Sequence, residues 1–179
     1  MKIFLADDAV LVREGLAGIL ERVGHEVVGQ TPDAPSTIAT LRALLNADPD
    51  AVDVLVVDVR MPPTMADDGL RVASELRQDF PELNVMVLSQ YVAPAYASTL
   101  FDPTAMSRPG AERGGLGYLL KERVSRVADF VRSLEVVASG GVVVDPEVAA
   151  GLVRGKGSAL DALTPRESEV LEMMAQGKS

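Results

Sequence analysis

The sequence predicts a doubly wound α/β fold, in which helices cover both faces of a parallel sheet of five strands. Short apolar runs alternate along the chain with longer segments whose apolar residues recur at helical spacing. Runs such as Val54–Val57 are apolar at every position, which is typical of parallel strands that are buried on both faces. A repeated strand–helix–strand order also requires right-handed crossovers, and these place helices on both sides of the sheet.

The strands and helices follow from these runs in chain order. Strands are expected at Lys2–Ala6, Glu26–Gly29, Val52–Val57, Asn84–Leu88 and Gly117–Leu120. Helices are expected at Val10–Val23, Ser36–Ala47, Gly69–Asp79 and Val124–Ser139. The alternation is interrupted after the fourth strand, where an irregular stretch at Phe101–Gly110 lies in the place of a helix.

The last part of the chain predicts a linker and the start of a second unit. Gly140 and Gly141 end the last helix of the α/β unit as a C-cap, and a short helix begins at Asp145-Pro146-Glu147. A further helix is expected at Leu163-Thr164-Pro165-Arg166-Glu167, because Thr is a good N-cap and is followed by Pro and Glu at suitable positions. We therefore divide the chain into residues 1–140, a linker at 141–162 and the beginning of another domain at 163–179.

Composition limits the classes of protein to which the chain can belong. With a hydrophobic content of 47%, the chain can form a sizeable core. There is no cysteine for disulfides or thiolate metal sites, and every apolar run is too short to span a membrane. The acidic start is unlike a signal peptide, so we expect a cytoplasmic protein. A formal charge of −9 argues against DNA binding by the chain as a whole.

Polar side chains follow four of the five predicted strands, at the point where each strand ends. They are Asp7 and Asp8, Asp58, Ser89 and Lys121. In an open parallel sheet the carboxyl ends of the strands form the usual ligand-binding edge. If these strands are neighbours, three carboxylates, a hydroxyl and an ammonium group converge on one pocket.

This pocket predicts a magnesium site and a phosphoryl acceptor. Clustered carboxylates remain ionised together only beside a cation, and a set of oxygen ligands favours Mg²⁺. A carboxylate in that setting can attack a phosphoryl group and form an aspartyl phosphate. Asp58 is the best nucleophile, because it follows the most buried strand and precedes the turn at Met61-Pro62-Pro63.

These residues resemble the receiver domains of two-component response regulators. The matching motifs are Asp7-Asp8, Asp58-Val59-Arg60-Met61-Pro62, Ser89 and Gly117-Tyr118-Leu119-Leu120-Lys121. The resemblance covers about residues 1–140 and implies a flavodoxin-like sheet with the strand order 2-1-3-4-5. It implies that Asp58 is phosphorylated by a sensor histidine kinase in a Mg²⁺-dependent reaction. Asp8 would then bind Mg²⁺ directly, Asp7 through water, and Arg60 through its backbone carbonyl.

The same resemblance implies roles for three further residues and for the C-terminal segment. Ser89 and Lys121 would contact the phosphoryl oxygens, and Tyr118 would be the aromatic switch that reports their rearrangement. The segment Leu163–Glu167, with Val170-Leu171 and Gly177-Lys178-Ser179, resembles the opening of a LuxR-type helix-turn-helix domain. The parent protein would thus control transcription by binding DNA, and the resemblance allows it to form a homodimer. The recognition helix is absent from this segment, so we expect no specific DNA binding by the chain itself.

Two alternatives remain open at this point. A pseudo-receiver that binds partners without phosphorylation is favoured by Gln90 and by the long interval from Ser89 to Lys121. A Mg²⁺-dependent phosphatase with an aspartyl phosphate is the less favoured alternative. Such enzymes generally need a second acid two positions after the nucleophile, where this chain has Arg60. We therefore expect a regulator that is not an enzyme.

Overall fold

A computed structural model of the chain describes residues 1–93, 95, 98, 100 and 113–154. Within these residues, six strands form one parallel sheet in the order β2-β1-β3-β4-β5-β6. The strands are β1 (Lys2–Ala6), β2 (Glu26–Thr31), β3 (Val54–Asp58), β4 (Val85–Ser89), β5 (Leu116–Leu120) and β6 (Val142–Val144). This arrangement confirms the predicted doubly wound α/β fold.

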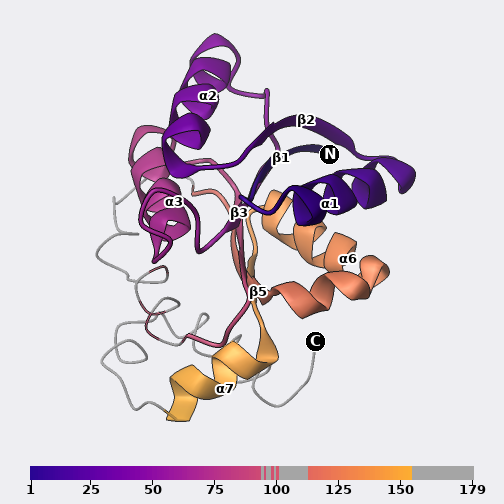
Figure 1. Cartoon of the computed structure of the whole chain (residues 1–179). Helices are drawn as coiled ribbons and strands as arrows, with labels where there is room; N and C mark the ends of the chain where they lie inside the picture. Colours follow the sequence, from indigo (N-terminus) through magenta and orange to yellow (C-terminus); the bar gives the residue numbers. More distant parts are fainter. Residues whose placement is uncertain (94, 96–97, 99, 101–112, 155–179) are drawn as a thin grey trace.

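Helices cover both faces of this sheet (Figure 1). They are α1 (Val10–Arg22), α2 (Ala34–Ala47), α3 (Asp68–Asp79), α6 (Val127–Ala138) and α7 (Pro146–Arg154), with a 3-10 turn, η1, at Lys121–Ser125. One face of the sheet shares a cluster of buried side chains with α2, α3 and α7. The other face shares a second cluster with α1 and α6. The sheet therefore separates two apolar cores.

Burial and capping explain where these elements form. Every residue of β3, β4 and β5 is buried, as expected for central strands that are covered on both faces. The carboxylate of Asp33 accepts a hydrogen bond of 2.8 Å from the Ser36 N–H and caps α2, with Pro35 in its first turn. Gly140 has a φ of +91° just after α6, which confirms the predicted glycine C-cap.

The sixth strand was not predicted from the sequence. The sequence pattern indicates a linker over these residues, but they pair with β5 in the register Leu116↔Val142 to Tyr118↔Val144. Three residues after a Gly-Gly pair carry too little pattern to indicate a strand, and their pairing depends on the exposed edge of β5. The short helix expected at Asp145-Pro146-Glu147 is present as α7.

Two predicted segments lie outside the described residues. They are the irregular stretch at Phe101–Gly110 and the helix-turn-helix start at residues 163–179. Among the helices that the structure does describe, none combines the length and the apolar character that crossing a membrane requires.

Candidate functional site

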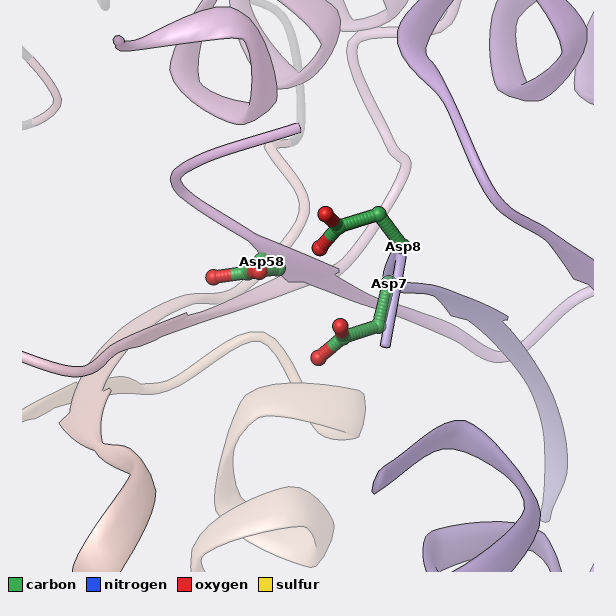
Figure 2. A group of neighbouring side chains, drawn as sticks. All are labelled: Asp7, Asp8 and Asp58. Atoms are coloured by element: carbon green, nitrogen blue, oxygen red, sulfur yellow. The ribbon is translucent and has the colours of Figure 1, made fainter. Parts of the chain in front are cut away.

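Three carboxylates meet at the carboxyl ends of β1 and β3 (Figure 2). Ala6 and Val57 are register partners in these neighbouring strands, so the next residues, Asp7 and Asp58, emerge side by side. One carboxylate oxygen from each of Asp7, Asp8 and Asp58 lies within 4.8 Å of the others. Asp7 and Asp58 are buried, whereas Asp8 is half-buried. The topology of the sheet thus brings Asp58 next to Asp7 and Asp8, about 50 residues earlier in the sequence.

Lys121 reaches this cluster from the end of β5, where the η1 turn begins. Its Nζ atom lies 2.9 Å from Oδ2 of Asp7 and 3.1 Å from Oδ2 of Asp58. Its side chain is 22% exposed, so these contacts are only partly screened by solvent. Lys121 therefore bridges two of the three acids.

Burial and the neighbouring acids both act on the charge of Asp58, and burial has the larger effect. Burial, and secondarily the charge of Asp7, raise the pKa of Asp58 to about 6, although Lys121 acts in the opposite direction. Burial alone would lower the pKa of Lys121, but its contacts with Asp7 and Asp58 outweigh burial and raise that pKa. Asp58 is thus mostly ionised at neutral pH, at a cost in free energy that its burial imposes, while Lys121 stays protonated.

The loop after β3 folds back tightly against Asp58. A Cβ atom at Gly69 would lie 1.8 Å from the backbone oxygen of Asp58, so only glycine fits there. The Gly69 N–H donates to the Val59 carbonyl over 2.9 Å. Asp68 is buried and accepts hydrogen bonds from the backbone N–H and the hydroxyl of Thr64. These contacts fix the loop that borders the acids.

Ser89 and Arg60 lie at the same edge of the sheet, but their side chains contact a different residue. The buried hydroxyl of Ser89 donates to the Tyr91 carbonyl over 2.7 Å and accepts from the Tyr91 N–H over 3.3 Å. The exposed guanidinium group of Arg60 lies 5.1 Å from the centroid of the Tyr91 ring. Tyr91 therefore joins the segments after β3 and β4.

Tyr118, the expected switch residue, is fully buried in β5. It belongs to the core cluster that also contains Val87 from β4, Val144 from β6 and Val148 from α7. Its ring is therefore part of the apolar layer on the side of the sheet that α7 covers.

The three carboxylates fit a hard divalent cation. They supply only oxygen ligands at close spacing, and three carboxylates carry more negative charge than the one ammonium group of Lys121 neutralises. Mg²⁺ takes such ligands and retains several waters, for which the half-buried Asp8 leaves access. The donor set gives no reason to expect a softer metal, which would favour His or Cys ligands.

Sequence reasoning missed two features next to the site. The close approach of Gly69 could have been suspected from a glycine that opens a helix directly after the Asp58 loop. Arg123 was not singled out, yet it forms an ion pair of 2.9 Å with the buried Asp145, which lies 22 residues away in the sequence. A lone Arg after a strand carries no signal that indicates such a partner.

Comparison with known proteins gives a consistent result. A family model described as "Response regulator receiver domain" matches residues 3–107. The transcriptional regulatory protein LnrK of Bacillus subtilis is 29% identical over 99% of this chain and 78% of its own length. A structure of the Salmonella typhimurium RcsB response regulator, which concerns its conformational dynamism for DNA interaction, has a TM-score of 0.63 and 28% identity and covers 99% of this chain and 78% of that chain. The receiver domain of the putative regulator NarL from Mycobacterium tuberculosis has a TM-score of 0.55 and 27% identity, covering 75% of this chain and 95% of that domain.

Proposed function

Because the chain belongs to the response regulator receiver family, we propose that Asp58 accepts a phosphoryl group from a sensor histidine kinase in a Mg²⁺-dependent reaction. One observation carries this proposal: the carboxylate of Asp58 lies beside those of Asp7 and Asp8, and the ammonium group of Lys121 is 3.1 Å away. This arrangement combines a nucleophile, a set of metal ligands and a cation at one open edge of the sheet.

Asp7, Asp8 and Asp58 would hold the magnesium ion, with the backbone carbonyl of Arg60 as a further ligand. The charge of Mg²⁺ bound there would offset the repulsion among the acids and the negative charge of an incoming phosphoryl group. This proposal is supported by the oxygen-only donor set and by the raised pKa of Asp58.

In the proposed reaction a carboxylate oxygen of Asp58 attacks phosphorus as the bond between phosphorus and the donor breaks. With a phosphohistidine donor, the P–N electron pair leaves with the imidazole, which takes up a proton. Lys121 would move from its contact with Asp58 to a phosphoryl oxygen while remaining close to Asp7. Ser89 would contact a second phosphoryl oxygen after its hydroxyl leaves the Tyr91 carbonyl.

The output would be control of transcription. We assign residues 1–140 to the receiver, 141–162 to a linker and 163–179 to the start of a LuxR-type DNA-binding domain. The relatives support this assignment, since LnrK is a transcriptional regulatory protein and the RcsB structure concerns interaction with DNA. Tyr118, buried in the same cluster as Val148 of α7, would act as the switch residue between the phosphoryl site and this output.

Phosphoryl transfer from acetyl phosphate tests the proposal directly. We expect the wild-type chain with Mg²⁺ to take up one acid-stable, base-labile phosphoryl group, seen as a mass increase, and EDTA to prevent it. Asp58→Asn abolishes uptake because the nucleophile is lost, and Lys121→Ala reduces it at least about tenfold because a charge near the transferred group is lost. Asp50→Asn, at an exposed acid outside the cluster, is the control and leaves uptake unchanged.

The alternatives give other results in the same assay. A folded wild-type chain that takes up no phosphoryl group is a pseudo-receiver, and continued release of phosphate over many turnovers identifies a phosphatase. The chain alone is expected to bind no specific DNA. Sequence-selective retention in a gel shift at nanomolar concentration contradicts that expectation.

A further inference from the structure

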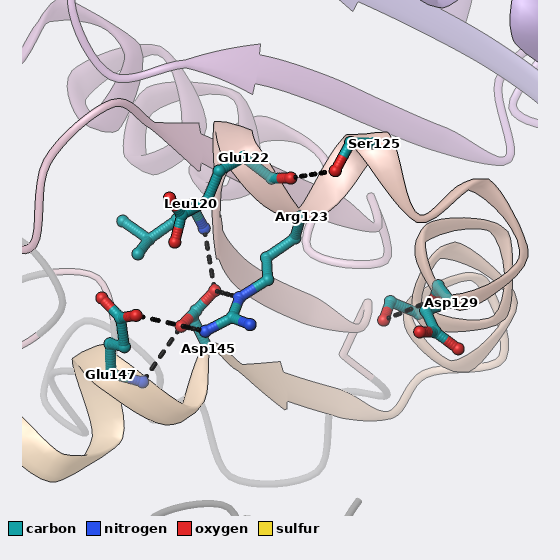
Figure 3. Close-up of polar contacts among 8 residues, drawn as sticks. Leu120, Glu122, Arg123, Ser125, Asp129, Asp145 and Glu147 are labelled. Carbon is teal, nitrogen blue, oxygen red and sulfur yellow. Dashed lines mark hydrogen bonds and ion pairs between the residues drawn. The ribbon is translucent and has the colours of Figure 1, made fainter.

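Another buried acid, Asp145, lies outside the cluster, where β6 ends and α7 begins (Figure 3). Its side chain is fully buried, and its carboxylate accepts four hydrogen bonds from residues that the structure describes. Oδ2 accepts from the Leu120 N–H at 3.1 Å and from Nε of Arg123 at 2.9 Å, and Oδ1 accepts from Nη2 of Arg123 at 3.2 Å and from the Glu147 N–H at 3.0 Å. A buried carboxylate that is bonded in this way is held in one position.

Two of these contacts fix the segment that carries Lys121. Leu120 directly precedes Lys121, and Arg123 lies two residues after it in the η1 turn. The ladder between β5 and β6 ends at Tyr118↔Val144, so the Asp145 side chain replaces a strand partner for the Leu120 N–H. The backbone on both sides of Lys121 is therefore anchored to Asp145, while its side chain reaches Asp7 and Asp58.

The remaining contacts make Asp145 the N-cap of α7, directly before the first helical residue, Pro146. Its side chain caps the helix through the Glu147 N–H, and its backbone oxygen accepts from the Ala149 N–H over 2.8 Å. Val148 and Ala149 are fully buried in the cluster that contains Tyr118. Asp145 is thus hydrogen-bonded both to the start of α7 and to the η1 turn.

We propose that the Arg123–Asp145 ion pair is a positioning element that couples the location of Lys121 to the docking of α7. The pair holds the η1 turn so that Lys121 reaches the acid cluster, and it carries a displacement of Lys121 into the first turn of the helix that leads toward the C-terminal segment. The link from Lys121 to α7 follows from the contacts alone. Its use by a phosphoryl group rests on the proposed function of Asp58.

The chemistry of the pair suits this role. Arg123 offers two nitrogen atoms to both oxygens of Asp145, and separating them would leave a fully buried charge without its partner. The two residues therefore move together. Because coupling between two sites is reciprocal, loosening α7 must also change how well Lys121 is placed at the acids.

Hydrogen exchange of the α7 amides in the full chain tests the coupling through a double-mutant cycle. The cycle compares the wild type, Lys121→Met, Arg123→Gln and the double variant, with the Ala149 amide as the reporter. We expect Lys121→Met to change Ala149 exchange about fivefold or more, and to change it less than about twofold when Arg123 is already Gln. Arg132→Gln, which removes an exposed ion pair on α6, is the matched control and leaves α7 exchange unchanged.

A second readout measures whether the pair positions Lys121. Arg123→Gln should slow phosphoryl uptake from acetyl phosphate about fivefold, and Arg123→Lys should restore part of the rate because it keeps the charge but not the two-pronged contact. If Arg123→Gln does not fold, Arg123→Lys replaces it in the exchange cycle. An effect on stability alone would not give partial rescue of the rate together with a non-additive exchange cycle.

Two results overturn the coupling: unchanged α7 exchange in Lys121→Met, or equal changes with and without Arg123. The exchange cycle uses no phosphodonor, so it decides the coupling even if the wild type takes up no phosphoryl group. Failure of uptake would instead refute the proposed function of Asp58.

Discussion

Two buried carboxylates lie at the ends of parallel strands on the same edge of the sheet, Asp58 as the last residue of β3 and Asp145 directly after β6, but their surroundings are opposite. Asp58 lies against two other acids and shares Lys121 with Asp7, and burial raises its pKa to about 6. Asp145 receives four hydrogen bonds from described neighbours, two of them from Arg123, and its side chain has no exposed surface. The first site has excess negative charge, whereas the second is neutralised within the fold.

The difference indicates that the acids around Asp58 form a binding site, whereas Asp145 holds neighbouring elements of the fold together. A cluster with uncompensated charge gains free energy when a cation arrives, so it is suited to a metal and to chemistry. A carboxylate whose hydrogen bonds are satisfied gains nothing from a ligand and instead fixes the elements that donate to it. Changes at Asp145 should therefore affect stability most, and changes at Asp58 should affect ligand and pH dependence.

The largest expected effect on stability is that of Arg123→Gln. We expect it to lower the free energy of unfolding by about 3 kcal/mol, because the charge of the fully buried Asp145 loses its partner. Urea unfolding monitored by circular dichroism measures this change. A loss well below 1 kcal/mol would mean that solvent screens the pair and that the contrast between the two carboxylates is overstated.

Gly69→Ala tests whether close packing sets the geometry of the acid site. The added Cβ would lie 1.8 Å from the Asp58 carbonyl oxygen, so the backbone must shift at a cost of about 2 kcal/mol. We also expect weaker Mg²⁺ binding in a fluorescence or calorimetric titration, because the shift displaces Asp58.

Gly18→Ala is the matched control for this substitution. Gly18 lies inside α1 with nothing within 4 Å of the added Cβ, so alanine there should stabilise the chain by up to about 1 kcal/mol. If both variants lose stability equally, crowding against Asp58 is not the cause.

Asp58→Asn should stabilise the metal-free chain at pH 7.5 by about 1 kcal/mol. The pKa of Asp58 is raised to about 6 by burial and by the charge of Asp7. A raised carboxyl pKa contributes stability below the unfolded-state value of about 3.9, and this contribution is lost as the pH rises through the folded-state value. Ionised Asp58 therefore costs stability at neutral pH, and asparagine removes that cost.

The same measurement at pH 4 provides the check on the sign. The stabilisation by Asp58→Asn should shrink there, because the wild-type carboxyl is protonated in the fold. Adding Mg²⁺ at pH 7.5 should raise the melting temperature of the wild type more than that of the variant. A stabilisation that is larger at pH 4 than at pH 7.5 would contradict the assigned cause.

The sequence predicted the fold class because burial on both faces leaves a clear pattern. The strands around Val54–Val57 and Val85–Leu88 are continuous apolar runs, and the structure places them in the centre of the sheet. It also predicted which polar residues lie at one edge, since the ends of parallel strands must meet there. The structure brings together Asp7, Asp8, Asp58 and Lys121, while their chemical roles remain proposals.

What the sequence did not predict depends on contacts between distant segments. The strand β6 has only three residues and exists because β5 offers an unpaired edge. The pairing of Arg123 with Asp145 joins an η1 turn to a helix cap across 22 positions, and neither residue is unusual in its local context. The hydroxyl of Ser89 donates a hydrogen bond to the Tyr91 carbonyl, a contact that the sequence pattern does not indicate.

The smallest expected effect on stability is that of Arg42→Gln. It tests whether burial, and not ion pairing alone, makes the Arg123–Asp145 pair stabilising. Arg42 on α2 lies 2.8 Å from Glu75 and 2.9 Å from Asp79 on α3, so its geometry is as good as that of Arg123. All three side chains are more than 40% exposed, and water can replace the lost contacts at little cost. We therefore expect the urea midpoints of Arg42→Gln and the wild type to agree within error. They should also agree in 0.5 M salt, about fivefold above the concentration at which the Debye length is roughly 10 Å. If Arg42→Gln instead lowers the free energy of unfolding as much as Arg123→Gln does, the stability of the Arg123–Asp145 pair comes from ion pairing in general and not from the burial of Asp145.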